Sequence, residues 1–183
     1  MRRSTGATLA ARIAPPRTAG PAPRGAHAGV EVRRPGQTDL GIRRLGYADL
    51  PDVIAIERRS FPAPWSLAMF VLELSKPTSI CLGAFDGTRL CGHLVCSRYH
   101  TVWHLMNVAI EPRYRRLGIA TLLINRLFEL AGDHDRYTLE VRVSNAEAIA
   151  MYGRFSFRGA GVRRRYYHDN GEDALIMWRS RSQ

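Results

Sequence analysis

The sequence VWHLMNVAIEPRYRRLGIATLLINRLFELAG (residues 102–132) joins an apolar strand to an amphipathic helix through a short basic loop. Residues 102–110 form an apolar run of strand length. After Gly118 the apolar residues recur at helical spacing, and Gly132 is placed to end the helix. A helix that starts at a glycine presents free backbone N–H groups and the positive end of its dipole, so we predict an anion site here.

The loop contains RRLGIA (115–120), and a near copy, RRLGYA, occurs at 43–48. Both fit Arg-x-x-Gly-x-Ala, so only the surrounding sequence can distinguish them. At 43–48 the preceding strand is short, Asp49 is placed to cap the following helix, and Pro51 lacks an N–H group. We therefore predict that the first copy is structural. The second copy is predicted to hold a pyrophosphate, with Arg115 and Arg116 adding positive charge.

The remaining elements follow from periodicity and turn residues. Strands are predicted at 41–45, 79–85, 89–100, 136–143, 158–167 and 173–178, with a turn at Asp86-Gly87. Helices are predicted from Asp49, from Ser66 and, behind the capping box formed by Ser144 and Glu147, from about Asn145. This order predicts one α/β (α+β) domain at 39–183, with a central mixed, mostly antiparallel sheet flanked by helices.

Residues 1–38 are predicted to be a disordered basic tail rich in Pro, Ala and Arg. Residues 1–30 carry five arginines and no acidic residue, which leaves +6 of the net charge of +11 on the rest of the chain. The tail could be a nucleic-acid arm or an organelle presequence, but its prolines disfavour the amphipathic helix of a presequence. A passive tail, or an over-extended start codon, is the favoured interpretation. The basic body indicates either an anionic partner or an arginine-rich composition without a specific role.

Other residue types limit the function classes. No apolar run reaches the ~20 residues that span a bilayer, so we expect no integral membrane protein. The three cysteines, Cys81, Cys91 and Cys96, form no Cys-x-x-Cys pair and are read as buried thiols of a cytoplasmic protein. The six histidines are scattered, and no metal site is predicted.

Residues 40–180 resemble the Gcn5-related N-acetyltransferase (GNAT) superfamily, through the 115–120 loop and TLEVRVSNAEAIAMY (138–152). Within it, IERRSFPAPWS (56–66) and RRRYYHDNGEDALIM (163–177) resemble the ribosomal-protein-alanine N-acetyltransferases. The resemblance implies a GNAT-like acyl-coenzyme A N-acyltransferase fold. It also implies direct transfer of acetyl from acetyl-CoA, with no metal, to a protein N-terminal α-amine. The favoured acceptor is the N-terminal alanine of a small-subunit ribosomal protein. Such an enzyme could associate with the ribosome.

The resemblance also assigns the cofactor-binding residues. The backbone of Val108, Ala109 and Ile110 would contact the pantetheine, and one N–H, favoured as that of Val108, would polarise the thioester carbonyl. Asn145 would contact the pantetheine arm. The residues around the pyrophosphate would be Arg115, Arg116, Leu117, Gly118, Ile119, Ala120 and Thr121.

Glu140 matches the general base of the family, which would take a proton from the α-amine. An ion pair with Arg142, two residues on along the same strand face, is the structural alternative. Tyr152 matches the general acid that protonates the departing thiolate, with core packing as its alternative. Tyr166 and Tyr167 would line the peptide groove, although alternation allows only one of them to face it.

The chain departs from the family pattern after Tyr152. Gly153 lies inside the predicted helix, and Ser156 stands where glycine usually ends it, which predicts a looser helix end. A local acidic groove of Glu140, Glu172 and Asp173 would offset the basic body for a basic acceptor. Two alternatives stay open: a GNAT enzyme for a small amine or an internal lysine, and an inactive GNAT fold that binds RNA or the ribosome. No specific nucleic-acid site and no membrane association is predicted.

Overall fold

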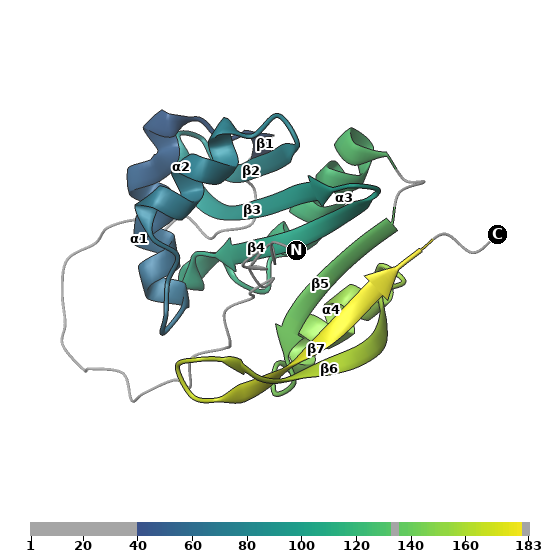
Figure 1. Ribbon diagram of the computed structural model, residues 1–183. Helices are drawn as coiled ribbons and strands as arrows, with labels where there is room; N and C mark the ends of the chain where they lie inside the picture. Colours follow the sequence, from purple (N-terminus) through teal and green to yellow (C-terminus); the bar gives the residue numbers. More distant parts are fainter. Residues whose placement is uncertain (1–39, 133–135, 181–183) are drawn as a thin grey trace, which may run out of the picture.

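The seven strands form one sheet in the order β1-β2-β3-β4-β5-β7-β6 (Figure 1). This computed structural model describes residues 40–132 and 136–180, so the predicted tail lies outside the described residues. The pairing of β4 with β5 is parallel and the others are antiparallel, which confirms the predicted fold class. The strands are β1 (Leu40–Arg44), β2 (Ser79–Asp86), β3 (Arg89–Tyr99), β4 (Val102–Ile110), β5 (Arg136–Arg142), β6 (Arg158–Tyr167) and β7 (Glu172–Arg179).

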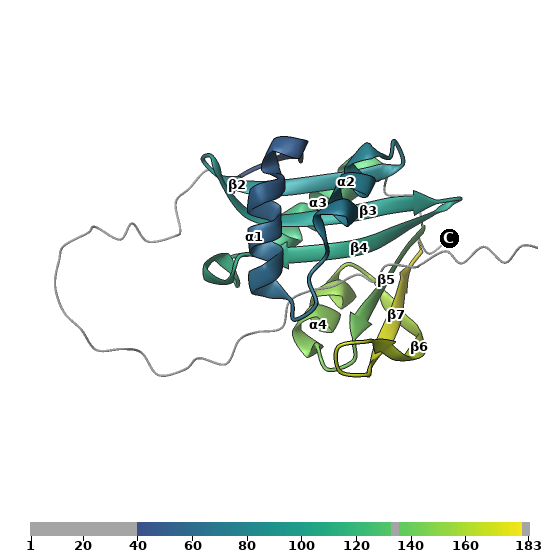
Figure 2. The same cartoon turned by 60° about the vertical axis from the view of Figure 1, so that its left-hand side comes forward.

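Four helices cover the two faces of the sheet. Helices α1 (Leu50–Ser60) and α2 (Leu67–Ser75) lie on one face, and α3 (Ile119–Ala131) and α4 (Ala146–Arg154) lie on the other (Figures 1 and 2). Each face has its own apolar core, because alternate strand residues point to opposite sides. Leu139 and Val141 of β5 pack on the α3/α4 side, whereas Met106 and Ala109 of β4 pack on the α1/α2 side.

The pairing of β4 with β5 is short. It covers only Val102–His104 against Arg136–Thr138. Beyond these pairs β4 continues to Ile110 along β3, and β5 continues to Arg142 along β7, so the two strands diverge (Figure 1). A register shift leaves Met106 as an extra residue in β4, and such a bulge bends a strand. We call the divergence of β4 and β5 beyond these pairs the split.

Two predicted side-chain caps do not form. Asp49 stands at the N-cap position of α1 as predicted, but its carboxylate accepts from Arg43 at 2.7 and 2.8 Å and from Gly46 N at 2.8 Å instead of from the helix, because a bidentate guanidinium is the stronger partner. Helix α4 is capped by Asn145, whose Oδ1 accepts from Ala148 N at 3.2 Å, and not by Ser144.

The Ser144 N–H donates instead to Glu172 at 3.0 Å, which delays the helix start by one residue. The predicted Ser66 cap of α2 is confirmed. The predicted glycine end of α3 at Gly132 is confirmed as well.

Close packing between β3 and β4 predicts that Gly92→Ala destabilises the protein. An alanine Cβ at position 92 would lie 2.5 Å from Ile110 Cδ1 and 2.9 Å from the Ala109 carbonyl oxygen. We expect a loss of about 1–3 kcal/mol in the free energy of unfolding, measured by chemical denaturation. Gly41→Ala is the matched control, because nothing lies within 4 Å of its Cβ, and should stay within about 0.5 kcal/mol. Equal effects of both variants would contradict the packing argument.

Candidate active site

The loop before α3 has the geometry of an anion site. Arg116 and Gly118 both adopt left-handed backbone conformations, with φ of 67° and 77°. The first helical hydrogen bond runs from Leu122 N to Gly118 O at 3.1 Å. The N–H groups of Ile119 and Ala120 precede that bond, so no carbonyl of the helix can accept from them.

A cavity of about 650 Å³ opens in front of these N–H groups, a volume typical of sites for small ligands. Its walls come from the loop, from β4 and from α4, so it lies on the α3/α4 face. Arg116 donates to Glu147 of α4 at 2.7 Å, and both residues line the cavity. The predicted cofactor residues that line it are Val108, Ile110, Arg115, Arg116, Gly118, Ile119, Ala120 and Thr121.

The first hexapeptide, at 43–48, lacks this geometry. Asp49 occupies both the Gly46 N–H and the Arg43 guanidinium, so neither is available to an anion. The same pair holds the pKa of the Asp49 carboxyl below its usual range, chiefly through the hydrogen bond from Arg43. The predicted structural role of the first copy agrees with these contacts.

Val108 turns its backbone toward the split. The Glu111 N–H donates to the Cys91 carbonyl at 2.8 Å, and the register of β3 and β4 is continuous from there back to Asn107. Because bonded and non-bonded pairs alternate in an antiparallel ladder, Ala109 bonds to β3 while Val108 and Ile110 face away from it. Arg115 Nε donates to the Ile110 carbonyl at 3.2 Å, in agreement with this alternation. Since β5 has diverged at this level, the Val108 N–H has no strand partner among the described residues.

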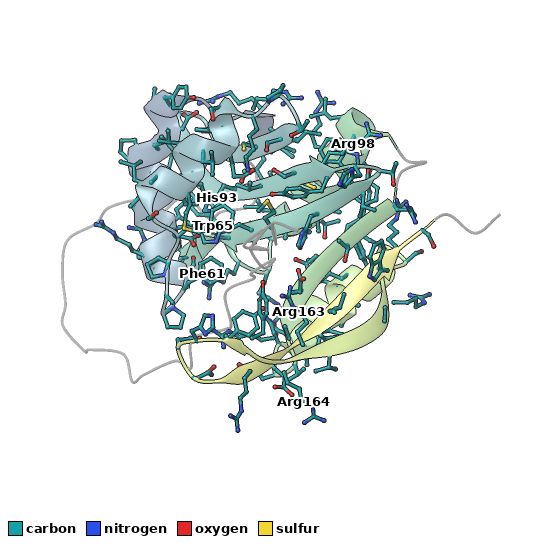
Figure 3. All side chains as sticks on the ribbon, in the orientation of Figure 1. Phe61, Trp65, His93, Arg98, Arg163 and Arg164 are labelled. Atoms are coloured by element: carbon teal, nitrogen blue, oxygen red, sulfur yellow. The ribbon has the colours of Figure 1, made fainter. Side chains whose placement is uncertain are left out.

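Glu140 lies on the opposite face of the sheet from the cavity. Its side chain is 6% exposed, and its Oε2 lies 2.6 Å from His104 Nε2. Its Oε1 accepts from Arg163 at 3.0 Å, and Figure 3 shows Arg163 beside β5 and β7. Arg142 pairs with Asp169 and not with Glu140, so the alternative ion pair is wrong. Glu140 does have a cationic partner, but it comes from β6.

Tyr152 is completely buried on α4, on the same face as the cavity. Its ring packs on Phe157 with centroids 5.7 Å apart. Its hydroxyl has no hydrogen-bond partner among the described residues, and burial raises its pKa above the usual range. The group therefore stays protonated at neutral pH, as a donor that no described side chain or backbone group uses.

The model of the acetyltransferase (GNAT) family matches residues 50–157. The chain belongs to the GNAT family. A putative [ribosomal protein bS18]-alanine N-acetyltransferase of Bacillus subtilis is 36% identical over 151 residues, which cover 78% of this chain and 96% of that protein. The N-alpha-acetyltransferase RimI of Mycobacterium tuberculosis is 35% identical over 144 residues, covering 75% and 90%.

The crystal structure of the ribosomal-protein-S18-alanine N-acetyltransferase from Escherichia coli has a TM-score of 0.72 and 31% sequence identity. The structural match covers 79% of this chain and 96% of the E. coli chain. Together with the family match, these relatives identify the chain as an acetyl-CoA-dependent N-acetyltransferase.

Three of the predicted cofactor-binding residues, Asn145, Leu117 and Ala109, do not line the cavity. Asn145 does not line the cavity, and its Oδ1 is engaged by the cap of α4. Leu117 is exposed and Ala109 is buried against α1 and α2, and neither lines the cavity. The N–H groups of Ser156 and Phe157 close the end of α4 by donating to the carbonyls of Gly153 and Tyr152, and the looser end stays a prediction. Ser156 adopts the left-handed conformation, φ 66°, in place of glycine.

The β6–β7 hairpin separates the two predicted groove tyrosines. Tyr167 is 5% exposed and packs under the guanidinium of Arg142 at 3.8 Å. Tyr166 is half-buried and lies under Arg163, at 4.4 Å, the same arginine that bonds Glu140. Of the two, Tyr166 therefore lies beside the Glu140 site.

The three carboxylates of the predicted acidic groove, Glu140, Glu172 and Asp173, each accept hydrogen bonds from other residues of the chain. Burial alone would raise the pKa of Glu172, but hydrogen bonds from Ser144 and Arg142 lower it to about 2. Asp173 accepts from Arg165 N at 2.8 Å. Each carboxylate, Glu140 included, is thus occupied by donors of the chain itself.

His104 is the site residue that the sequence reading missed. It lies in the apolar run of β4, where a polar residue facing away from Trp103 and Leu105 was the available signal. The described residues contain no cluster of three or more His, Cys, Asp or Glu side chains suited to a metal ion. They also contain no helix long and apolar enough to cross a membrane. The three cysteines are buried and unpaired, and burial raises the pKa of Cys81 to about 12.

The left-handed backbone at Gly118 predicts that Gly118→Ala weakens acetyl-CoA binding. A Cβ in this conformation costs about 1–2 kcal/mol, so relaxation of the loop should raise the Kd about tenfold. Isothermal titration with acetyl-CoA measures the effect. Gly153→Ala is the control, because it lies inside α4 with open space around its Cβ, and should stabilise the helix without changing the Kd. An unchanged Kd for Gly118→Ala would contradict the role of the loop.

Proposed function

We propose that this enzyme transfers acetyl directly from acetyl-CoA to the N-terminal α-amine of a protein. We infer that its preferred acceptor is the N-terminal alanine of a small-subunit ribosomal protein. The observation that carries the proposal is the split, which leaves the Val108 N–H unpaired between a cavity on one face and the Glu140 site on the other. A ribosomal acceptor would place the enzyme in the cytoplasm and in contact with the ribosome.

The residues of the cavity fit the chemical parts of acetyl-CoA. The N–H groups at the start of α3, with Arg116, suit a pyrophosphate. The outward backbone groups of Val108 and Ile110 suit the amides of a pantetheine arm, which would lie along β4 where β5 has diverged. Bound acetyl-CoA would supply the activated acetyl group as a thioester.

The Val108 N–H would stabilise the charge that develops on the thioester oxygen. Negative charge grows on that oxygen as the amine adds, and a fixed donor in a site without water is worth several kcal/mol there. The donor needs no reorganisation, because β3 holds β4 in place through Ala109 and Glu111.

Glu140 would receive the proton of the α-amine, directly or through one water. An α-amine has a pKa of about 7.7–8.0, against about 10.4 for lysine, so a larger fraction is neutral at pH 7 and less base strength is needed. His104 and Arg163 hold both oxygens of Glu140, which fixes the carboxylate relative to the split. Arg163 is partly exposed, and an incoming ammonium group would compete with it for the same oxygen.

Tyr152 would protonate the departing thiolate. It lies on the cavity face, where the thiol of acetyl-CoA would depart, whereas Glu140 lies on the other face, from which the amine would enter. Its raised pKa keeps the proton available at neutral pH.

The alanine acceptor is supported by the names of the B. subtilis and E. coli relatives, which specify bS18 or S18 alanine. The test is acetylation of a peptide that begins Ala-Arg and contains an internal lysine, with the product mapped by mass spectrometry. We expect the acetyl group on the α-amine, and no product from an N-terminally formylated copy. Preference for the lysine or for polyamines would overturn the proposal.

Glu140→Gln should lower kcat by about 10²–10⁴-fold, the range for loss of a general base, while the Kd for acetyl-CoA stays unchanged. The binding site should persist because the cavity lies on the other face of the sheet. Glu129→Gln on the exposed surface of α3 is the matched control. Unchanged turnover in Glu140→Gln would remove Glu140 as the base.

Tyr152→Phe should lower kcat about 10²-fold or more without loss of stability, because it removes only a buried hydroxyl that lacks a partner. Tyr137→Phe is the contrasting control, since its hydroxyl donates to Gly132 O at 2.7 Å. That variant should lose about 1 kcal/mol of stability and keep its kcat. Steady-state kinetics measures the effect on kcat, and thermal unfolding measures the effect on stability. Full activity in Tyr152→Phe would leave Tyr152 as a core residue.

A further inference from the structure

We propose that Glu57 is a positioning residue for the acceptor, because it ties the connection between α1 and α2 to β4 beside the split. The inference rests on the proposed function. It identifies what holds in place the acceptor side of the site, by which we mean the α1/α2 face of the sheet at the split. Glu57 is fully buried, lies on α1 and takes no part in the chemistry described above.

One oxygen of Glu57 joins two separate parts of the chain. Its Oε1 accepts from the backbone N–H of Trp65 at 2.9 Å and from Asn107 Nδ2 at 3.1 Å. Trp65 ends the connection between α1 and α2, and Asn107 directly precedes Val108 in β4. A single carboxylate thus fixes the connection relative to the strand that carries the Val108 N–H.

The connection between α1 and α2 (residues 61–66) is short and contains two prolines, and we call it the arch. Phe61 and Trp65 are buried at its two ends, and Pro62, Ala63 and Pro64 between them are exposed. Proline fixes φ, so two prolines in three residues leave the arch little conformational freedom. Its position therefore depends on the two anchored ends, and the Trp65 end is held by Glu57.

The arch and the β6–β7 hairpin lie on opposite sides of the split. Figure 3 shows Phe61, Trp65 and His93 grouped on the β4 side, and Arg163 on the other side. Glu140 and Glu57 both belong to the α1/α2 face of the sheet, opposite the cavity. An acceptor chain that enters from this face to reach Glu140 would pass between the arch and the hairpin.

Glu57 is surrounded by other buried polar side chains, several of which have polar atoms that make no hydrogen bond. Glu57 Oε2 lies 3.4 Å from His93 Nε2 without a hydrogen bond. Among the described residues, Ser60 Oγ on the same helix, His93 Nδ1 and Asn107 Oδ1 are also buried without a hydrogen-bond partner. Such atoms lower stability, and an apolar cluster of the same shape would avoid that loss. Their concentration beside the acceptor side indicates that the cluster serves position rather than stability.

Steady-state kinetics with the Ala-Arg peptide test this inference. In Glu57→Leu the KM for the peptide should rise about tenfold, the effect of losing one or two buried hydrogen bonds, whereas the KM for acetyl-CoA should stay within about twofold. Glu57→Gln is the conservative control, because its amide oxygen can still accept from Trp65 and Asn107, and should restore the peptide KM. Hydrogen exchange at the Trp65 amide should accelerate in Glu57→Leu and not in Glu57→Gln.

Asn107→Asp provides a second variant if Glu57→Leu does not fold. It keeps the side-chain volume but places a carboxylate against Glu57, so the peptide KM should rise while the acetyl-CoA KM does not. An unchanged peptide KM, or equal changes in both KM values, would overturn the positioning role. If the wild-type enzyme does not acetylate the peptide, the proposed function fails, and this outcome is distinct from the failure of Glu57 alone.

Discussion

The site depends on the length of one strand pairing. β4 and β5 pair over only three residues each, and both are then held by other neighbours, β3 on one side and β7 on the other. A backbone N–H in the middle of a sheet normally has a partner, and an unpaired one is costly when buried. The sheet tolerates the split because each diverging strand keeps one complete ladder. The open side of β4 is then available to a ligand that supplies the missing partner.

Strand alternation turns the split into a site with two sides. Successive residues of β5 point to opposite faces of the sheet. Leu139 and Val141 therefore pack in the α3/α4 core, and Glu140 points to the other face. The start of α3 with its free N–H groups, the cavity and the buried Tyr152 therefore share one face, and the Glu140 carboxylate with His104 and Arg163 lies on the other. Under the proposed function, the amine and the thioester would meet where the sheet is open. The strand pairing and the loop before α3 together place the two sides of this site.

Local sequence patterns predicted the element order, the mixed sheet and the strand–loop–helix of residues 102–132. Context also separated the two Arg-x-x-Gly-x-Ala copies, since the Asp49 carboxylate lies next to the first of them. Contacts between distant segments could not be predicted in the same way. Glu140 bonds His104 and Arg163, 36 and 23 residues away, and Glu57 bonds Asn107, 50 residues away, so only tertiary packing brings them together. The caps at Asp49 and Ser144 failed for the same reason, because a charged partner elsewhere took the expected group.

The most direct test of the central role of Val108 is the backbone amide resonance of Val108 in complexes with acetyl-CoA and with CoA. The two ligands differ only in the acetyl group, so their comparison isolates a hydrogen bond to the thioester carbonyl. We expect the Val108 amide proton to move downfield and to exchange more slowly with acetyl-CoA than with CoA. Ala109, whose N–H bonds to β3, should be the same in both complexes. Identical Val108 resonances in the two complexes, or a larger difference at Ala109, would show that the Val108 N–H does not bond the thioester carbonyl.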